Sequence, residues 1–134
     1  MLVKIALLAQ SRQRALVTHI LVIEDDRPIR DLFRDVLSDE GYDVVFVERL
    51  EHAAADADPD LVITDLAGLH GYDSGLARAL VHRVQERYPR TPIIVCTAHG
   101  QALDESDQLG AAAVLRKPFP IETLVDTLAR LASR

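Results

Sequence analysis

The sequence predicts an α/β fold in which five strands alternate with helices, and the helices cover both faces of a parallel sheet. Five short runs of Val, Ile and Leu are mostly continuous instead of alternating with polar residues, which is typical of parallel strands buried on both faces. Apolar residues in the segments between these runs recur at helical spacing. Each strand–helix–strand crossover is then expected to be right-handed.

The first predicted strand covers residues 19–23 and is followed by a helix. One face of this helix is apolar and consists of Ile29, Leu32, Phe33, Val36 and Leu37. Pro28 suits the first helical turn, because N–H groups there have no partner within the helix and proline, which has no N–H, loses no hydrogen bond. Gly41 is expected to end the helix, because glycine readily adopts the left-handed conformation beyond a helix terminus.

The remaining elements follow the same alternation. The other strands are predicted at residues 43–47, 61–64, 93–97 and 113–115. Two further helices are indicated by apolar stripes, one formed by Leu76, Leu80, Val81 and Val84, and the last by Ile121, Leu124, Val125, Leu128 and Leu131. Helices over residues 50–57 and 101–109 are weaker predictions, because these segments contain few large apolar residues.

The composition is that of a globular protein and excludes several classes of function. Hydrophobic residues make up 49% of the 134 residues and aromatic residues only 4%, so Leu, Val, Ile and Ala must build the core. The net charge of −6 argues against direct nucleic-acid binding, which needs a clustered excess of Lys and Arg. The single cysteine, Cys96, excludes an intramolecular disulfide framework and a Cys-rich zinc site.

The chain shows no sign of membrane association. No apolar stretch approaches the about 20 residues that a spanning helix needs, and the apolar start lacks a convincing signal-peptide cleavage site. We therefore expect a cytoplasmic protein with no membrane contact. Residues 1–18 form an N-terminal extension outside the strand–helix scheme, and they could adopt an amphipathic helix or an extra strand.

Polar residues follow the predicted strands where each strand ends. Glu24 and Asp25 follow the first strand, Asp65 the third, Thr97 ends the fourth, and Lys117 lies just past the fifth. Ligands of open α/β sheets bind outside the carboxyl ends of the strands, so these side chains should share one crevice. Like charges in such a crevice need compensation, which Lys117 and a divalent hard cation would supply.

Magnesium fits this crevice better than calcium, and phosphoryl transfer is the chemistry it suggests. The carboxylates are too few for a calcium cage, whereas Mg2+ uses one or two carboxylates together with water and a phosphate oxygen. No glycine-rich nucleotide-binding loop occurs, so ATP is not the expected phosphate donor. The natural nucleophile is then a carboxylate of the protein itself, Asp65.

Four segments in order resemble the receiver domain of two-component response regulators, in the stand-alone form known from chemotaxis regulators. They are ILVIEDDRPIR at residues 20–30, LVITDL at 61–66, IIVCTA at 93–98 and GAAAVLRKPF at 110–119. The resemblance covers roughly residues 19–132 and implies a receiver domain over 19–134. It also implies a flavodoxin-like, doubly wound sheet with strand order 2-1-3-4-5.

The resemblance implies a signalling phosphoacceptor and not an enzyme. Asp65 would accept a phosphoryl group from a phosphohistidine of a sensor histidine kinase or phosphotransfer protein, and the domain would then change its binding to a downstream effector. Mg2+ would be held by Glu24, Asp25, Asp65 and the backbone carbonyl of Ala67. Thr97 and Lys117 would contact the phosphoryl oxygens. The sequence leaves open the partners' identity and whether the chain forms a homodimer.

Two departures from the family pattern bear on the mechanism. The loop after Asp65 is longer than in receivers, and Val114 stands where they usually have a Tyr or Phe that changes rotamer. Two other functions therefore stay open. An aspartate-nucleophile phosphohydrolase would usually need a second carboxylate where this chain has Ala67. A pseudo-receiver would bind partners without phosphorylation, although the full set of acidic, hydroxyl and lysine residues argues against it.

Three smaller expectations concern Asp26, Cys96 and His99. Asp26 is expected to start the helix or support the metal ligands, because helix N-termini favour acidic side chains. Cys96 is expected to be a buried, inert thiol. His99 lies two residues after Thr97, where the resemblance implies an influence on water access to the phosphoryl group, and the alternative is a solvent-facing loop residue.

Overall fold

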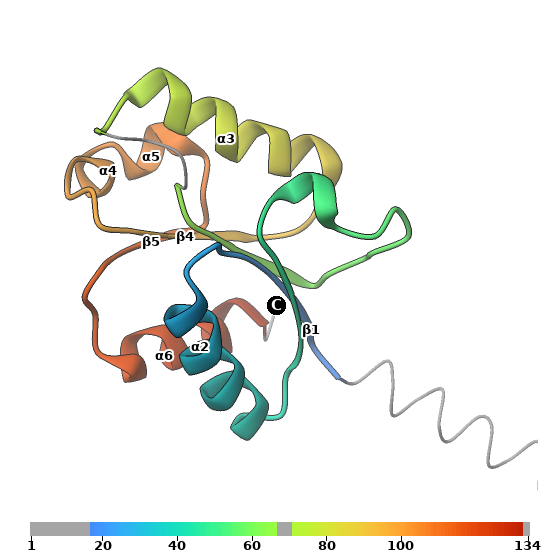
Figure 1. Ribbon diagram of the computed structural model, residues 1–134. Coiled ribbons are helices and arrows are strands. Elements are labelled where there is room, and N and C mark those ends of the chain that lie inside the picture. Colours follow the sequence, from blue (N-terminus) through green and yellow to red (C-terminus); the bar gives the residue numbers. More distant parts are fainter. Residues whose placement is uncertain (1–16, 67–70, 133–134) are drawn as a thin grey trace, which may run out of the picture.

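Five parallel strands form one sheet in the computed structural model, which describes residues 17–66 and 71–132 (Figure 1). The strands are β1 (His19–Ile23), β2 (Asp43–Val47), β3 (Leu61–Thr64), β4 (Ile93–Thr97) and β5 (Ala113–Arg116). Their order is β2-β1-β3-β4-β5, which confirms the predicted class and the predicted order. The last strand extends one residue beyond its predicted end.

Helices cover both faces of this sheet. They are α2 (Arg27–Asp39), α3 (Ser74–Arg87), α4 (Gln101–Asp104), α5 (Ser106–Leu109) and α6 (Ile121–Ala132). Figure 1 shows α2 and α6 on one face and α3 with α5 on the other. Each face has its own apolar cluster, one containing Phe33, Leu37 and Leu128 and the other containing Val81 and Val84.

Acidic residues cap the N-termini of the two longest helices, α2 and α3. The Asp26 carboxylate accepts a hydrogen bond from the Ile29 N–H at 3.1 Å, and that of Asp73 accepts one from the Leu76 N–H at 2.9 Å. Such caps satisfy N–H groups that have no partner in the first helical turn. Three residues, Glu24, Asp25 and Asp26, therefore separate the end of β1 from the start of α2, and Asp26 caps the helix as expected.

The helix predicted over residues 50–57 is wrong beyond its first turn. Only a short 3-10 helix, η1 (Leu50–His52), forms in this connection. The guanidinium of Arg87, at the end of α3, donates hydrogen bonds to the carbonyl oxygens of Leu50, Ala53 and Ala54. These carbonyls are thus satisfied by a side chain from a distant element, and the segment contributes few large apolar groups that would favour a packed helix.

The helix predicted over residues 101–109 is divided into α4 and α5 at Glu105. The carboxylate of Glu105 accepts hydrogen bonds from the hydroxyls of Tyr72, at 2.6 Å, and Ser74, at 3.0 Å. These contacts connect the segment before α3 to the junction between the two short helices.

Burial is deepest in the centre of the sheet. All residues of β3 and β4 are buried, whereas Val45 of the edge strand β2 is 57% exposed. Cys96 is buried in β4, as expected, and burial raises the pKa of its thiol to about 12. The central strands thus fix the positions of the residues that follow them.

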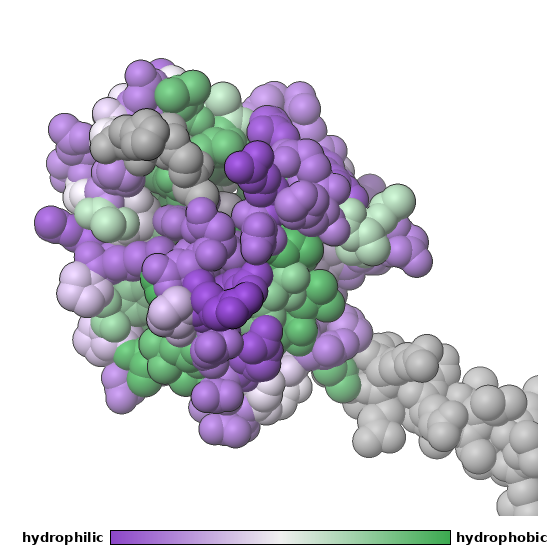
Figure 2. Space-filling model, in the orientation of Figure 1, coloured by the Kyte–Doolittle hydropathy of each residue, from purple (hydrophilic) through white to green (hydrophobic). Residues whose placement is uncertain are grey.

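Figure 2 shows hydrophilic side chains over most of the face seen in Figure 1. Among the described helices, none is both long and apolar enough to cross a membrane. Most of the predicted N-terminal extension, residues 1–16, lies outside the described residues.

Candidate metal centre at the carboxyl edge of the sheet

Three carboxylates meet where β1 and β3 end. Glu24 and Asp25 follow β1, Asp65 follows β3, and the two strands are paired so that Ile23 lies beside Thr64. One oxygen from each carboxylate lies within 4.8 Å of the others. Strand register thus brings together side chains that are about 40 residues apart in sequence.

Lys117 lies against two of these carboxylates. Its Nζ is 3.3 Å from Oε2 of Glu24 and 3.5 Å from Oδ1 of Asp65. The Lys117 N–H donates to the carbonyl of Thr97 at 2.8 Å, which fixes the start of the segment after β5. The Lys117–Pro118 peptide bond is cis.

The charges of this cluster shift the pKa values of Glu24 and Lys117. Burial raises the pKa of Glu24, the charge of Asp65 raises it further, and Lys117 opposes both effects. Burial acts to lower the pKa of Lys117, but the charges of Asp65 and Glu24 outweigh it and raise this pKa overall. The lysine therefore stays an ammonium group at neutral pH and compensates part of the negative charge.

The three carboxylates differ in exposure and in hydrogen bonding. Glu24 is buried, and its Oε1 accepts a hydrogen bond from the Asp26 N–H at 3.1 Å. Asp65 is half-buried, and its Oδ1 accepts one from the Leu66 N–H at 2.9 Å. Asp25 is exposed at the mouth of the site. Oxygen donors of this kind fit a hard divalent cation such as Mg2+.

Thr97 lies at the end of the neighbouring strand β4. It is fully buried, and its Oγ accepts a hydrogen bond from the His99 N–H at 3.1 Å. Among the described residues, its hydroxyl forms no hydrogen bond with the three carboxylates. Ala67, the predicted source of a metal-binding carbonyl, lies outside the described residues.

Val114 and Tyr72 occupy the face of the sheet covered by α3. Val114 is half-buried and packs against the apolar cluster on that face. Tyr72 is half-buried as well, and its ring centroid lies 6.0 Å from that of His99. Burial, the hydrogen bond to Glu105 and the charge of Glu105 raise the pKa of Tyr72 to about 12. Because Tyr72 and Glu105 are far apart in sequence, sequence reasoning did not find this contact.

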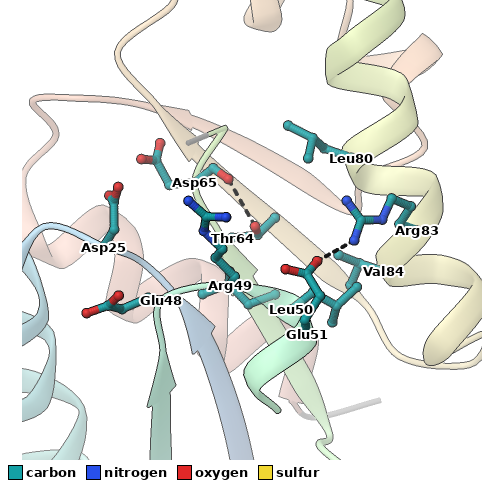
Figure 3. A pocket seen from close by; sticks show the side chains of 11 residues that line it. Asp25, Glu48, Arg49, Leu50, Glu51, Thr64, Asp65, Leu80, Arg83 and Val84 are labelled. Carbon is teal, nitrogen blue, oxygen red and sulfur yellow. Dashed lines mark hydrogen bonds and ion pairs between the residues drawn. The ribbon is translucent and has the colours of Figure 1, made fainter. Parts of the chain in front are cut away.

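A pocket of about 330 Å³ adjoins Asp25 and Asp65 (Figure 3). It opens between α3 and the segment after β2, where only η1 forms. Its apolar wall consists of Ile23, Leu50, Leu80 and Val84. Figure 3 shows the Arg49 side chain extending into it from the end of β2, on the side of Asp65 and Asp25. Sequence reasoning missed Arg49, because nothing local marks it as close to the strand ends.

Comparison with known proteins agrees with this geometry. The family model of the response regulator receiver domain matches residues 20–129. The response regulator protein FleR of Pseudomonas aeruginosa is 36% identical over 121 residues, which are 84% of this chain and 24% of FleR. The chain thus spans about a quarter of that relative's length.

Solved structures give the same result. The chemotaxis response regulator CheY4 of Vibrio cholerae superimposes with a TM-score of 0.67 at 29% identity, over 86% of this chain and 98% of that one. A response regulator from Thermotoga maritima has a TM-score of 0.74 at 21% identity, over 89% of this chain and all of the other, and this likeness concerns the fold. Sheet order, strand-end residues and these matches together show that the chain belongs to the response regulator receiver domain family of two-component signalling.

Proposed function

We propose that Asp65 is the phosphoacceptor of this receiver domain. The observation that supports this best is its carboxylate, which lies within 4.8 Å of two further acids and 3.5 Å from the ammonium group of Lys117. An oxygen of Asp65 would attack the phosphorus of a phosphohistidine on a histidine kinase or phosphotransfer protein. The phosphorus–nitrogen bond then breaks, and its electron pair stays on the imidazole of the donor.

Magnesium dependence is part of the proposal. Receiver domains bind Mg2+ at an acidic pocket, and the oxygen donors present here match that chemistry. Asp25 and Asp65 would be direct ligands, Glu24 would act through water because Lys117 and the Asp26 N–H already hold its oxygens, and the Ala67 carbonyl would complete the set. The cation would offset the charge of the incoming phosphoryl group.

The remaining site residues would hold the phosphoryl oxygens. Lys117 would exchange part of its contact with Asp65 for a phosphoryl oxygen. The Thr97 hydroxyl would donate to a second oxygen, which requires it to turn from its contact with the His99 N–H. This movement would alter the surface around α4 and change binding to an effector protein, so the domain acts as a switch and not as an enzyme with a separate substrate.

Two further assignments belong to this proposal. We divide the chain into an extension over residues 1–18 and a receiver domain over 19–134, supported by the family match over 20–129. We also assign the protein to the cytoplasm. Its partners would be proteins and not nucleic acids, because the net charge of −6 disfavours binding to a polyanion.

The test is phosphorylation by acetyl phosphate with Mg2+, followed by mass spectrometry of the intact chain. We expect one added phosphoryl group in the native protein and none in Asp65→Asn. Asp56→Asn is the matched control, because Asp56 is exposed and lies away from the site, and it should be modified like the native protein. Full modification of Asp65→Asn would show that another residue is the acceptor.

The same experiment separates the two other functions. A phosphohydrolase would turn over small phosphate esters repeatedly, with release of inorganic phosphate far beyond one equivalent. A pseudo-receiver would show neither an added phosphoryl mass nor a spectral response to beryllofluoride with Mg2+. Either result would replace the phosphoacceptor assignment.

A further inference from the structure

The pocket beside Asp65 contains a cation that the phosphoacceptor assignment does not use. Arg49 lines the pocket, and it forms no ion pair with the described residues. The other arginine of the pocket wall, Arg83, is paired with Glu51. Figure 3 shows the Arg49 guanidinium directed toward the side on which Asp65 and Asp25 lie.

The charges at the site indicate what Arg49 could bind. Three carboxylates face one ammonium group, and a divalent cation would cancel the two remaining negative charges. A phosphate group on a small donor brings about two more negative charges at pH 7. Lys117 already contacts both Glu24 and Asp65, whereas Arg49 lines the pocket without an ion pair to a described residue and is available to the rest of an incoming donor.

We propose that Arg49 is a specificity-determining residue that binds the anionic oxygens of a small phosphodonor, such as an acyl phosphate, in this pocket. The proposal rests on the function assigned to Asp65. A guanidinium presents several N–H donors in one plane, which matches phosphate and carboxylate oxygens. The apolar wall of Leu50, Leu80 and Val84 leaves room for the small organic part of the donor.

Arg49 would assist the transfer of the phosphoryl group from the donor to Asp65, in which the rest of the donor is the leaving group. An Asp65 oxygen attacks the phosphorus of an acyl phosphate, the bond from phosphorus to the acyl oxygen breaks, and the carboxylate leaves with the electron pair. Negative charge thus moves onto the leaving carboxylate. Arg49 would offset this charge on the donor, while Lys117 remains with the phosphoryl group.

The test compares Arg49→Gln with the native protein at saturating Mg2+, with acetyl phosphate as the donor. We expect phosphorylation about tenfold slower in the variant, the typical effect of one charge-assisted hydrogen bond. With phosphoramidate, which has one negative charge less and whose P–N bond breaks to release neutral ammonia, the loss should be less than threefold. Arg49→Lys should recover part of the rate, and 1 M salt should shrink the difference between variant and native protein.

Arg90→Gln is the control for net charge, because Arg90 is exposed and precedes β4 at the opposite edge of the sheet. Equal slowing in both variants, or equal slowing with both donors, would overturn the role of Arg49. Faster phosphorylation and tighter Mg2+ binding in Arg49→Gln would show that Arg49 merely repels the metal. A native protein that takes no phosphoryl group would instead contradict the assignment of Asp65.

Discussion

Replacing Lys117 by Met removes the cation that compensates a buried carboxyl group. Nζ of Lys117 lies 3.3 Å from Oε2 of Glu24, and the side chains are 20% and 3% exposed. With an effective dielectric constant of about 20, the Coulomb attraction at this distance is about 5 kcal/mol. In the variant, Glu24 can bind a proton and so avoid being a buried charge without a partner. The free energy of that protonation is therefore the upper limit of the unfolding free energy that the substitution can cost.

This limit depends on pH. For a carboxyl group with the ordinary pKa of 4.5, protonation costs about 3.4 kcal/mol at pH 7 and about 0.7 kcal/mol at pH 5, at about 1.36 kcal/mol per pH unit. Burial already raises the pKa of Glu24 in the native protein. The native protein therefore already bears part of this free-energy cost, and the substitution adds only the rest. We therefore expect Lys117→Met to lose about 2–3 kcal/mol of unfolding free energy at pH 7 and less than about 1 kcal/mol at pH 5.

The sign follows from linkage. Without Lys117, the pKa of Glu24 in the folded state rises further above its unfolded value. The difference in unfolding free energy between the variant and the native protein is therefore smallest below pH 4.5, and it grows as the pH rises. Urea denaturation at pH 5, 6 and 7 without Mg2+ measures this trend. Glu24→Gln in the Lys117→Met background is the control, and it should remove most of the pH dependence. A destabilisation that stays constant from pH 5 to 7, or grows toward pH 5, would refute this reasoning.

Three further predictions concern the metal, the Tyr72 contact and the switch. Asp25→Asn should weaken Mg2+ binding by about tenfold or more in a titration, because a magnesium site uses few carboxylates, and unchanged affinity would exclude Asp25 as a ligand. Tyr72→Phe should cost about 1–2 kcal/mol at pH 8, because it removes the 2.6 Å hydrogen bond to Glu105. Since the pKa of Tyr72 is raised to about 12, this gap should persist up to pH 10 and close above it, and a gap already closed by pH 9 would contradict the raised pKa. Val114→Tyr should enlarge the amide shifts of residues 100–120 on beryllofluoride addition, because Val114 is stiff and has no ring, and equal shifts would show that the missing aromatic is unimportant.

The sheet and the residues at its carboxyl edge could be predicted from the order of the amino acids. Continuous apolar runs mark β3 and β4, and both strands are buried along their length. The apolar stripe and proline at the start of α2 mark a helix that begins directly after the acidic residues. These signals are local, because strand and helix periodicities lie within about 15 residues. Strand ends in a parallel sheet share one edge, so Glu24, Asp25 and Asp65 could be expected to meet.

Features that depend on contacts between distant segments became visible only in the three-dimensional structure. The guanidinium of Arg87 donates hydrogen bonds to carbonyl oxygens of Leu50, Ala53 and Ala54, in a segment where the sequence pattern suggested a helix. Tyr72 holds Glu105 at the junction of α4 and α5, and the short η1 leaves the pocket that Arg49 enters. Each of these contacts joins elements separated by 30 residues or so along the chain, and no local periodicity encodes such a pairing. These groups come together only through the packing of distant elements, which is why they could be found in the structure alone.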